Sequence, residues 1–362
     1  MSTARITESR LLCGYRTVVF ENDLMSATVL PEKGADIHAL VYKPRAMDVL
    51  WKSPWGVKQT AGTAGVAAGD SEAAWMDIYP GGWQEIFPNG GDACLYKGAR
   101  LSFHGEASVS EWDYSIVRSQ GSAVEAVFTV RLARSPFVLR RTMRLEAGRA
   151  ELVISERVTN QGEEELQFMW GHHPAYGAPF LGAGCRLEVG ATTFEAHSPE
   201  VSPNVRVTAG TRGEWPRLVG KHGSSVDLSR VPSPEERATE FGYLSGIEEG
   251  RYRLTSQEHG FGVELAWPTA VFPYLWFWQE LRGSFGYPWY GRCYVMAVEP
   301  FTSIPGSGLV NAIERGTAPL LQAGQMLDAE LGFRFFEDSG NRRALEAPGL
   351  ILRRKKCGGD DT

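Results

Sequence analysis

Apolar and polar residues alternate one by one along much of this 362-residue chain. In the segment 137–145, Leu139, Met143 and Leu145 alternate with arginines and a threonine, and the segment 152–158 repeats the pattern less cleanly. Successive side chains of a β-strand point to opposite faces, so this period of two predicts strands with one buried face. An amphipathic helix would instead repeat its apolar residues every three to four positions.

Runs of β-branched and aromatic residues continue this strand pattern over most of the chain. They lie at 24–30, 36–42, 109–117, 123–132, 166–170, 262–266, 274–279, 294–298 and 330–336. Because they do not alternate with helical segments, they predict an all-β fold, a large antiparallel β-sandwich with very few short helices. The one helix that we expect is Ser233–Glu240, with Pro234 in its first turn. No repeat of 20–50 residues is visible, which argues against a propeller or solenoid.

We expect residues 1–340 to form one domain, because large all-β folds often exceed the usual length of about 150 residues per domain. The polar and charged end, 341–362, predicts a partly disordered tail. The small residues of Gln59–Gly69 predict a long loop. This loop is either a mobile cover over a site or a plain surface excursion, and the sequence leaves both open.

Composition excludes several classes of partner. The net charge of −6 and the pI of about 5.8 leave no basic surface for nucleic acid. The chain contains no run of about 18 apolar residues, so we expect no membrane segment. The first residues lack the apolar core of a secretory signal. Five scattered cysteines without CxxC spacing are typical of reduced thiols in the cytoplasm and offer no metal site. We therefore expect a cytoplasmic protein without a metal.

Four segments concentrate His, Glu, Trp and Gly, which a plain sandwich would not need. They are 83–91, 103–107, 170–177 and 297–303. Histidine exchanges protons near neutral pH, and glutamate is its usual carboxylate partner. A Gly or Pro follows several of these residues and places them at strand ends, where functional residues tend to lie. A single His beside a Gly is more often structural, but the four segments together indicate a site.

Three motifs within these segments resemble those of a known enzyme family. They are His104-Gly105 followed by Trp112, the segment Gly171–Tyr176 with its His-His-Pro sequence, and Val298–Pro305, with similar flanking segments at 34–37, 48–51 and 321–336. The family is that of the aldose 1-epimerases, the galactose mutarotase-like proteins. The resemblance implies a galactose mutarotase-like supersandwich. It also implies interconversion of the α and β anomers of a sugar, without a cofactor.

The resemblance assigns the catalytic roles position by position. The family's acid falls on His173, its base on Glu299 and its second active-site histidine on His104. Opening a sugar ring needs one proton removed from the C1 hydroxyl and one delivered to the ring oxygen. Glu299 should therefore be ionised and His173 protonated at rest, and neighbouring Glu side chains would raise the pKa of His173.

Other residues of these segments are candidates for holding the sugar. Hydroxyl groups need polar partners, and the C–H surface of a sugar packs on aromatic faces. Glu280 is either such a contact or a solvated charge. The full set of predicted contacts is Gln84, Glu85, His172, Tyr176, Trp276 and Glu280.

Two positions depart from the family pattern. Ser108 and Asn89 stand where relatives often carry an arginine. A phosphate group needs Arg or Lys nearby, so these departures favour a free, non-phosphorylated small-molecule sugar as the partner. The sequence does not decide whether the chain forms a homodimer through an exposed sheet edge.

Three alternatives compete with this interpretation. Glu85 or Glu106 could pair with Glu299 as the two carboxylates of a glycosidase or lyase. The chain could also be a non-catalytic carbohydrate-binding protein, although binding alone would not require both His173 and Glu299. A metal hydrolase is the weakest alternative. His172 and His173 are adjacent, so on a strand they point to opposite faces and cannot hold one ion.

Overall fold

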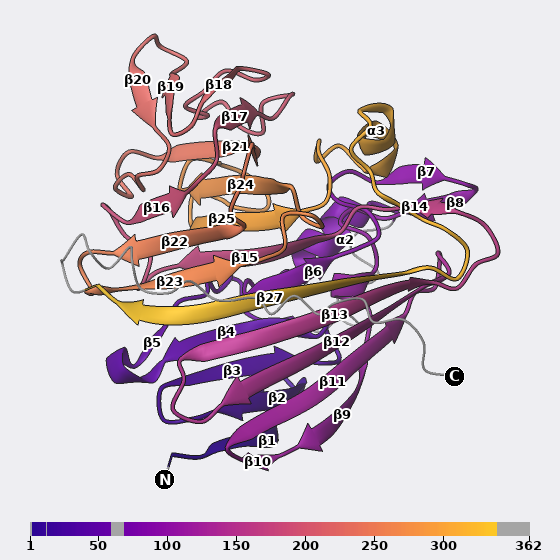
Figure 1. Cartoon of the computed structure of the whole chain (residues 1–362). Helices are drawn as coiled ribbons and strands as arrows, with labels where there is room; N and C mark the ends of the chain where they lie inside the picture. The colour runs from indigo at the N-terminus through magenta and orange to yellow at the C-terminus, as the bar shows by residue number, and fades with distance from the viewer. Residues whose placement is uncertain (1, 12, 59–68, 339–362) are drawn as a thin grey trace.

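The computed structural model describes residues 2–11, 13–58 and 69–338, and strands dominate it (Figure 1). Of the segment Gln59–Gly69, only Gly69 lies within the described residues, so the expectation of a loop there stays a prediction. The predicted tail, 341–362, lies outside them as well. The division into a domain of residues 1–340 and a tail also stays a prediction.

Thirteen strands form the larger of two main sheets, which we call the large sheet. Its neighbouring strands pair antiparallel. From edge to edge the strands are β10 (Gln120–Gly121), β1 (Ala4–Arg10), β2 (Arg16–Glu21), β3 (Met25–Leu30), β4 (Asp36–Tyr42), β6 (Trp83–Ile86), β15 (Gly171–Gly177), β25 (Tyr294–Phe301), β24 (Tyr274–Leu281), β21 (Ala238–Ser245), β17 (Thr193–Ala196) and β18 (Arg212–Glu214), with β5 (Met47–Asp48) paired to β4.

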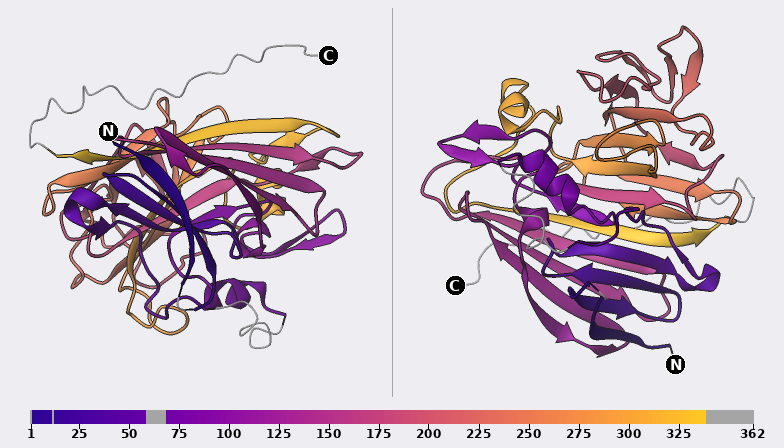
Figure 2. Two further views of the ribbon diagram at one scale, coloured as in Figure 1. Left: turned by 90° about the horizontal axis from the view of Figure 1, so that it is seen from below. Right: turned by 180° about the vertical axis from the view of Figure 1, so that it is seen from behind.

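Eight strands form the second main sheet, which lies over one face of the large sheet (Figures 1 and 2). In order they are β16 (Arg186–Val189), β22 (Arg251–Ser256), β23 (Phe261–Ala266), β27 (Met326–Glu337), β13 (Glu151–Asn160), β12 (Phe137–Glu146), β11 (Ala123–Arg131) and β9 (Asp113–Arg118). Three small pairs are β14 (Leu166–Gln167) with β26 (Leu320–Leu321), β19 (Arg217–Val219) with β20 (Ser225–Asp227), and β7 (Cys94–Tyr96) with β8 (Ala99–Leu101). The predicted antiparallel β-sandwich is confirmed.

Helices are short throughout the described ranges. They are α2 (Ser71–Asp77), α3 (Leu309–Glu314) and the 3-10 turns η1 (Lys43–Arg45) and η2 (Ala107–Val109). The helix predicted at Ser233–Glu240 is wrong, because β21 begins at Ala238 and pairs there with Leu281 of β24. Sheet pairing outweighs the weak local helix signal. No helix in the described part of the chain is long and apolar enough to cross a membrane.

Strand β12 shows how the alternating sequence builds the core between the sheets. Phe137, Leu139, Met143 and Leu145 are buried, and the residues between them are more exposed. Arg141 is the exception, because it lies on the buried face of the strand and is itself only 2% exposed. A charge in that position needs polar partners.

Arg141 joins the two sheets through a buried network of charged groups. Its Nε atom lies 2.7 Å from Glu156 of the second sheet, and its guanidinium group also binds Glu85 of the large sheet. His172 Nε2 lies 2.9 Å from the second carboxylate oxygen of Glu156. Trp170 donates its indole N–H to Glu85 at 2.8 Å. The polar groups of the network therefore neutralise one another inside the sandwich.

Replacing Arg141 by methionine tests this network. Arg141→Met leaves Glu85 and Glu156 buried without their shared cation, so the free energy of unfolding should fall by about 3–5 kcal/mol. The matched control is Arg157→Met on β13, which removes an exposed ion pair with Asp328 and should cost about 1 kcal/mol or less. Urea unfolding measures both losses. Two equally small losses would contradict a structural role for the network.

Candidate active site

One row of side chains crosses five neighbouring strands of the large sheet. Gln84 of β6 is paired with His173 of β15. Glu299 of β25 is paired with Trp276 of β24, and Trp276 with Tyr243 of β21. Directly opposed residues of antiparallel strands share a face, with their Cβ atoms about 4.5–5.5 Å apart. Strand register therefore brings residues from distant parts of the chain into line.

The pairing of β15 with β25 connects the two parts of this row. Gly171 lies opposite Phe301 and Ala175 opposite Ala297, so His173 falls opposite Glu299. A Cβ atom at Gly171 would lie 2.3 Å from a ring carbon of Phe301. Only glycine fits at this position, and its close contact with the Phe301 ring fixes how the two strands meet.

His173 and Glu299 form a buried pair. Their Nδ1 and Oε1 atoms are 3.1 Å apart, although the approach lies off the direction of a ring N–H hydrogen bond. On the other side of the ring, Nε2 of His173 lies 3.2 Å from the hydroxyl oxygen of Tyr79. The imidazole thus stands between a carboxyl group and a phenol, and protons can pass through it in either direction.

Burial governs the ionisation of this pair. It lowers the pKa of His173 to about 3 and raises the pKa of Glu299 well above its ordinary value. In both cases the interior disfavours the charged form. The expectation of a protonated His173 beside an ionised Glu299, with neighbouring Glu side chains raising the pKa of the histidine, is therefore wrong. Both shifts favour a neutral pair over a charged one.

Helix α2 lies on the outer face of the large sheet (Figure 2). Trp75 of this helix and Tyr79 after it pack against the ring of His173. The side chain of Asp70 accepts the first free N–H groups of α2, which fixes where the helix begins. Trp75 of α2 donates its indole N–H to Ser108 at 2.9 Å and stacks on Tyr79 with ring centroids 4.6 Å apart. Burial and the nearby Glu299 raise the pKa of Tyr79, so the phenol keeps its proton.

His104 is held as a neutral hydrogen-bond donor. Gly91 donates its backbone N–H to His104 Nδ1 at 3.0 Å, so Nδ1 is an acceptor and the ring proton lies on Nε2. Burial and the neighbouring His173 lower the pKa of His104 well below its ordinary value. The backbone of His104 has a φ of 55°, in the left-handed region that histidine adopts infrequently. Such strain is characteristic of functional sites.

His197 is held in the same tautomer by different partners. Its Nδ1 atom is bonded to the hydroxyl of Tyr243, and that hydroxyl accepts the N–H of Gly306 at 2.7 Å. Burial raises the pKa of Tyr243, so its proton remains and is donated to His197. Burial also lowers the pKa of His197 to about 4. The ring is neutral and has its proton on Nε2.

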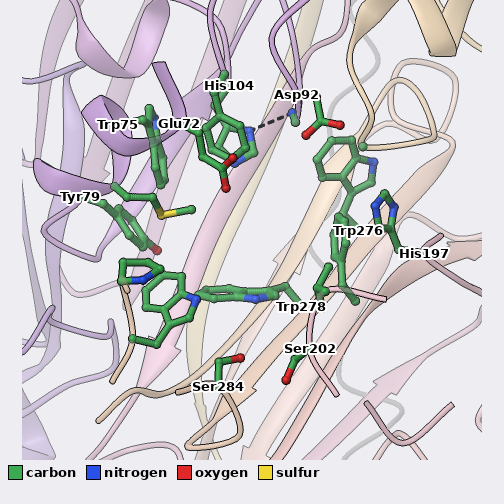
Figure 3. Close-up of a pocket in the computed structure, with 18 of the residues that line it drawn as sticks. Glu72, Trp75, Tyr79, Asp92, His104, His197, Ser202, Trp276, Trp278 and Ser284 are labelled. Carbon is green, nitrogen blue, oxygen red and sulfur yellow. Dashed lines mark hydrogen bonds between the residues drawn. The ribbon is translucent and has the colours of Figure 1, made fainter. Parts of the chain in front are cut away.

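These groups line a cavity of about 500 Å³ (Figure 3). Its walls carry three histidines, the carboxyl groups of Glu72, Asp92 and Glu299, and many aromatic rings. None of the described residues that line it is a lysine or arginine. The main aromatic rings are those of Trp75, Tyr79, Phe241, Trp276, Trp278 and Trp289. A cavity with this lining suits a neutral molecule that has both C–H surface and hydroxyl groups.

Four of the predicted site residues meet in this cavity: His104, His173, Trp276 and Glu299. Gln84 belongs to the same row but lies outside the lining, because its amide donates to Asp36 at 3.1 Å and to the carbonyl of Gly81 at 2.7 Å. Asn89 and Ser108, which stand where the resemblance implies arginines, also have structural partners.

Glu280, another predicted contact, serves the loop beside the cavity. Its buried Oε1 atom accepts the backbone N–H groups of Gly283 and Ser284, at 2.8 and 3.0 Å. Both of these loop residues line the cavity, whereas Glu280 itself does not. Its effect on a molecule bound in the cavity would therefore be indirect.

Glu85, His172 and Tyr176 lie away from the cavity as well. Glu85 and His172 belong to the network around Arg141 between the two sheets. The hydroxyl of Tyr176 lies 2.7 Å from that of Tyr252 of the second sheet. The expectation that His172 and His173 point to opposite faces is confirmed.

The carboxylate pairs considered for a glycosidase are not brought together. Glu85 is held inside the sandwich by Arg141, and Glu106 accepts the backbone N–H groups of Ala133 and Arg134, both at 2.9 Å. Among the described residues, no group of three or more His, Cys, Asp or Glu side chains is placed to hold a metal ion.

The sequence analysis missed Tyr79, Trp75 and His197, as well as the cavity wall made by residues 283–289. Tyr79 lies between α2 and β6 and precedes a Pro-Gly-Gly turn, whereas His197 directly follows the short strand β17. Their roles depend on partners far away in the sequence, such as Tyr243 for His197. Local sequence carries no signal for such contacts.

Solved structures share this fold. A protein from Klebsiella pneumoniae with the provisional name aldose 1-epimerase aligns with a TM-score of 0.70 and 14% identity, over 92% of this chain and 84% of that one. Galactose mutarotase-like proteins align with TM-scores of 0.59 and 0.61. The first, from Lactobacillus casei, has 20% identity over 88% and 100% of the two chains. The second, from Clostridium acetobutylicum, has 15% identity over 92% and 98%.

The fold is therefore the galactose mutarotase-like β-sandwich, as predicted. At these identities the likeness shows the fold alone. The model of the DUF4432 family, described as a domain of unknown function, matches residues 13–335, and this chain belongs to that family. No curated protein matches the sequence.

Nitrogen-15 NMR of the histidine rings tests the assigned tautomers. His104 and His197 should both carry their proton on Nε2 at neutral pH, and both should titrate below the ordinary value of about 6.5. The unfolded chain then binds more protons than the folded protein below that pH, so these rings destabilise the fold in acid. His104→Gln and His197→Gln assign the signals and should reduce the loss of Tm between about pH 6.5 and pH 4. An Nδ1–H tautomer, or titration near 6.5, would contradict the assignment.

Proposed function

We propose that this protein interconverts the α and β anomers of a free, non-phosphorylated aldose. The observation that carries the proposal is the buried contact of 3.1 Å between Nδ1 of His173 and Oε1 of Glu299. The pair lies in an aromatic cavity whose described lining contains no lysine or arginine. Proton transfer at a hemiacetal needs an acid and a base side by side. A phosphate group would need a cation in the lining. The shared fold with proteins named as mutarotase-like supports the same reaction class.

The reaction runs through a relay of neutral groups. In this relay the Glu299 carboxyl group turns its proton toward Nδ1 of His173, 3.1 Å away, and the imidazole proton on Nε2 faces the Tyr79 hydroxyl. The O1 hydroxyl of the sugar gives its proton to the second oxygen of Glu299. The carboxyl proton then passes to Nδ1, the Nε2 proton to Tyr79 and the Tyr79 proton to the ring oxygen O5.

The bonds of the sugar change as these protons move. The electron pair of the O1–H bond forms the C1=O1 double bond, and the pair of the C1–O5 bond stays on O5, which takes the proton. Rotation about C1–C2 and the reverse relay close the ring as the other anomer. Each protein group is neutral before and after, which suits a buried site where charges are costly. The cycle consumes no cofactor.

Fixed donors and acceptors hold the sugar during the reaction. His104 and His197 each offer an Nε2–H group, and Glu72 and Asp92 offer carboxyl oxygens in the same cavity. Sugar hydroxyls can both donate and accept, so each finds a partner. Trp276 stacks on Phe301 with ring centroids 3.7 Å apart and is only 1% exposed. The half-buried Trp278 of the same lining therefore offers the ring for the C–H surface of the sugar.

Polarimetry on freshly dissolved α-glucose and α-galactose tests the activity. The wild-type protein should speed the change of rotation of at least one free aldose. Glu299→Gln and His173→Asn should each slow it by about 100-fold or more, because each removes one member of the acid–base pair.

The controls are Glu163→Gln and His222→Asn, which change exposed residues outside the cavity lining and should keep the wild-type rate. A free aldose that stabilises the protein against heat, without faster mutarotation of any aldose, would favour the non-catalytic carbohydrate-binding alternative. Full activity in Glu299→Gln would exclude the proposed relay.

Tyr79→Phe tests the last step of the relay. The variant keeps the ring between Trp75 and His173 but has no proton for O5, so kcat should fall by about 100-fold or more with little change in KM. Tyr176→Phe removes an equally buried hydroxyl on the opposite side of the large sheet and should keep the wild-type kcat. An unchanged kcat in Tyr79→Phe would mean that His173 protonates O5 directly.

A further inference from the structure

Four large aromatic side chains stand exposed beside the mouth of the cavity. Phe285, Tyr287 and Tyr290 are 63%, 52% and 56% exposed, and Trp55 is 39% exposed. Phe285 and Tyr287 also line the cavity, so this aromatic rim continues from its inside to the surface. Trp55 and Tyr290 meet edge to face with ring centroids 5.8 Å apart. Exposed apolar patches next to a cavity mark binding surfaces.

The loop that carries three of these rings is held in a defined shape. The N–H of Gly291 donates to the carbonyl of Ser284 at 2.8 Å, which closes the loop on itself. The buried Glu280 accepts the N–H of Gly283 at 2.8 Å where the loop leaves β24. These bonds explain why a carboxyl group is buried at the end of that strand.

Further contacts fix the rings. The hydroxyl of Tyr287 donates to the carbonyl of Ala73 in α2 at 3.0 Å. The indole N–H of Trp55 donates to the carbonyl of Pro288 at 3.0 Å, and the guanidinium of Arg237 lies 5.5 Å from the centre of the Phe285 ring. Rings that are already fixed lose little side-chain entropy when a ligand stacks on them.

Polar groups accompany the aromatic rings at the mouth. Ser202, Ser284 and Glu72 line the cavity as well, with Ser202 and Ser284 on the side away from His104 (Figure 3). A sugar ring has a C–H face for aromatic rings and a hydroxyl edge for such groups. A purely apolar occupant would leave the polar groups without partners, which is unfavourable.

We infer that the aromatic rim is a second subsite, which takes a glycosyl unit attached to the sugar in the cavity. The preferred substrate is a reducing disaccharide. Its free anomeric centre lies at His173 and Glu299, and its second ring stacks on Phe285 and Tyr287. The position of the anomeric centre rests on the proposed function, whereas the affinity of the rim for a second sugar ring does not.

Binding to the Glu299→Gln variant tests the subsite without turnover. Titration of tryptophan fluorescence with cellobiose and with glucose should show about tenfold tighter binding of cellobiose, the gain expected of one well-packed aromatic contact. The wild-type protein gives a second readout, because kcat/KM for the mutarotation of cellobiose should exceed that for glucose by a similar factor. Equal affinities and equal kcat/KM values for the two sugars would overturn the inference.

Phe285→Ala should abolish the preference for cellobiose in both measurements. The control is Leu95→Ala on β7, which removes an apolar side chain with 68% exposure outside the cavity lining and should keep the preference. Gel filtration of the same variants detects the competing case. If Phe285→Ala converts a dimer to a monomer, the rim is an interface between copies of this chain and the inference fails.

The two proposals fail in distinguishable ways. Faster mutarotation of glucose without a preference for cellobiose would leave the proposed function intact and remove the subsite. Preferential, Phe285-dependent binding of cellobiose without mutarotation of any sugar would keep the subsite and remove the proposed function.

Discussion

The contact between His173 and Glu299 depends on the register of β15 against β25, and the rest of the site follows from it. Side chains alternate between faces along a strand, so a shift of one residue would carry His173 into the sandwich and bring His172 to the cavity. Two features oppose such a shift. On the cavity side, Gly171 lies so close to the Phe301 ring that no larger residue fits. On the inner side, His172 contacts Glu156 of the second sheet.

Burial then decides what chemistry the pair can perform. It raises the pKa of Glu299 and lowers that of His173, which favours the neutral form of both groups. A neutral pair can still move protons, provided that one group gives as another accepts. The fixed tautomers of His104 and His197 belong to the same pattern, because both rings act as donors without charge. The described cavity lining also has neither a lysine nor an arginine to attract an anion, which is consistent with the neutral sugar that we propose.

The sequence predicted the sandwich well because the alternation of apolar and polar residues is a local signal of strands with one buried face. It also separated His172 from His173, since neighbours on a strand face opposite ways. It missed Tyr79 and His197, whose roles come from contacts with residues far along the chain. It also made no prediction for Arg141, because the burial of this residue is decided by carboxyl groups on other strands. Long-range pairing of this kind leaves no trace in residue spacing.

The strand arrangement and the related structures establish the fold of this chain, and an experiment decides the reaction. A crystal structure with a bound free aldose is the most direct measurement. The account predicts O1 of the sugar at a hydrogen-bond distance of about 2.6–3.2 Å from Glu299, with O5 equally close to the hydroxyl of Tyr79. A sugar bound in the cavity with its anomeric carbon turned away from both groups would contradict the account.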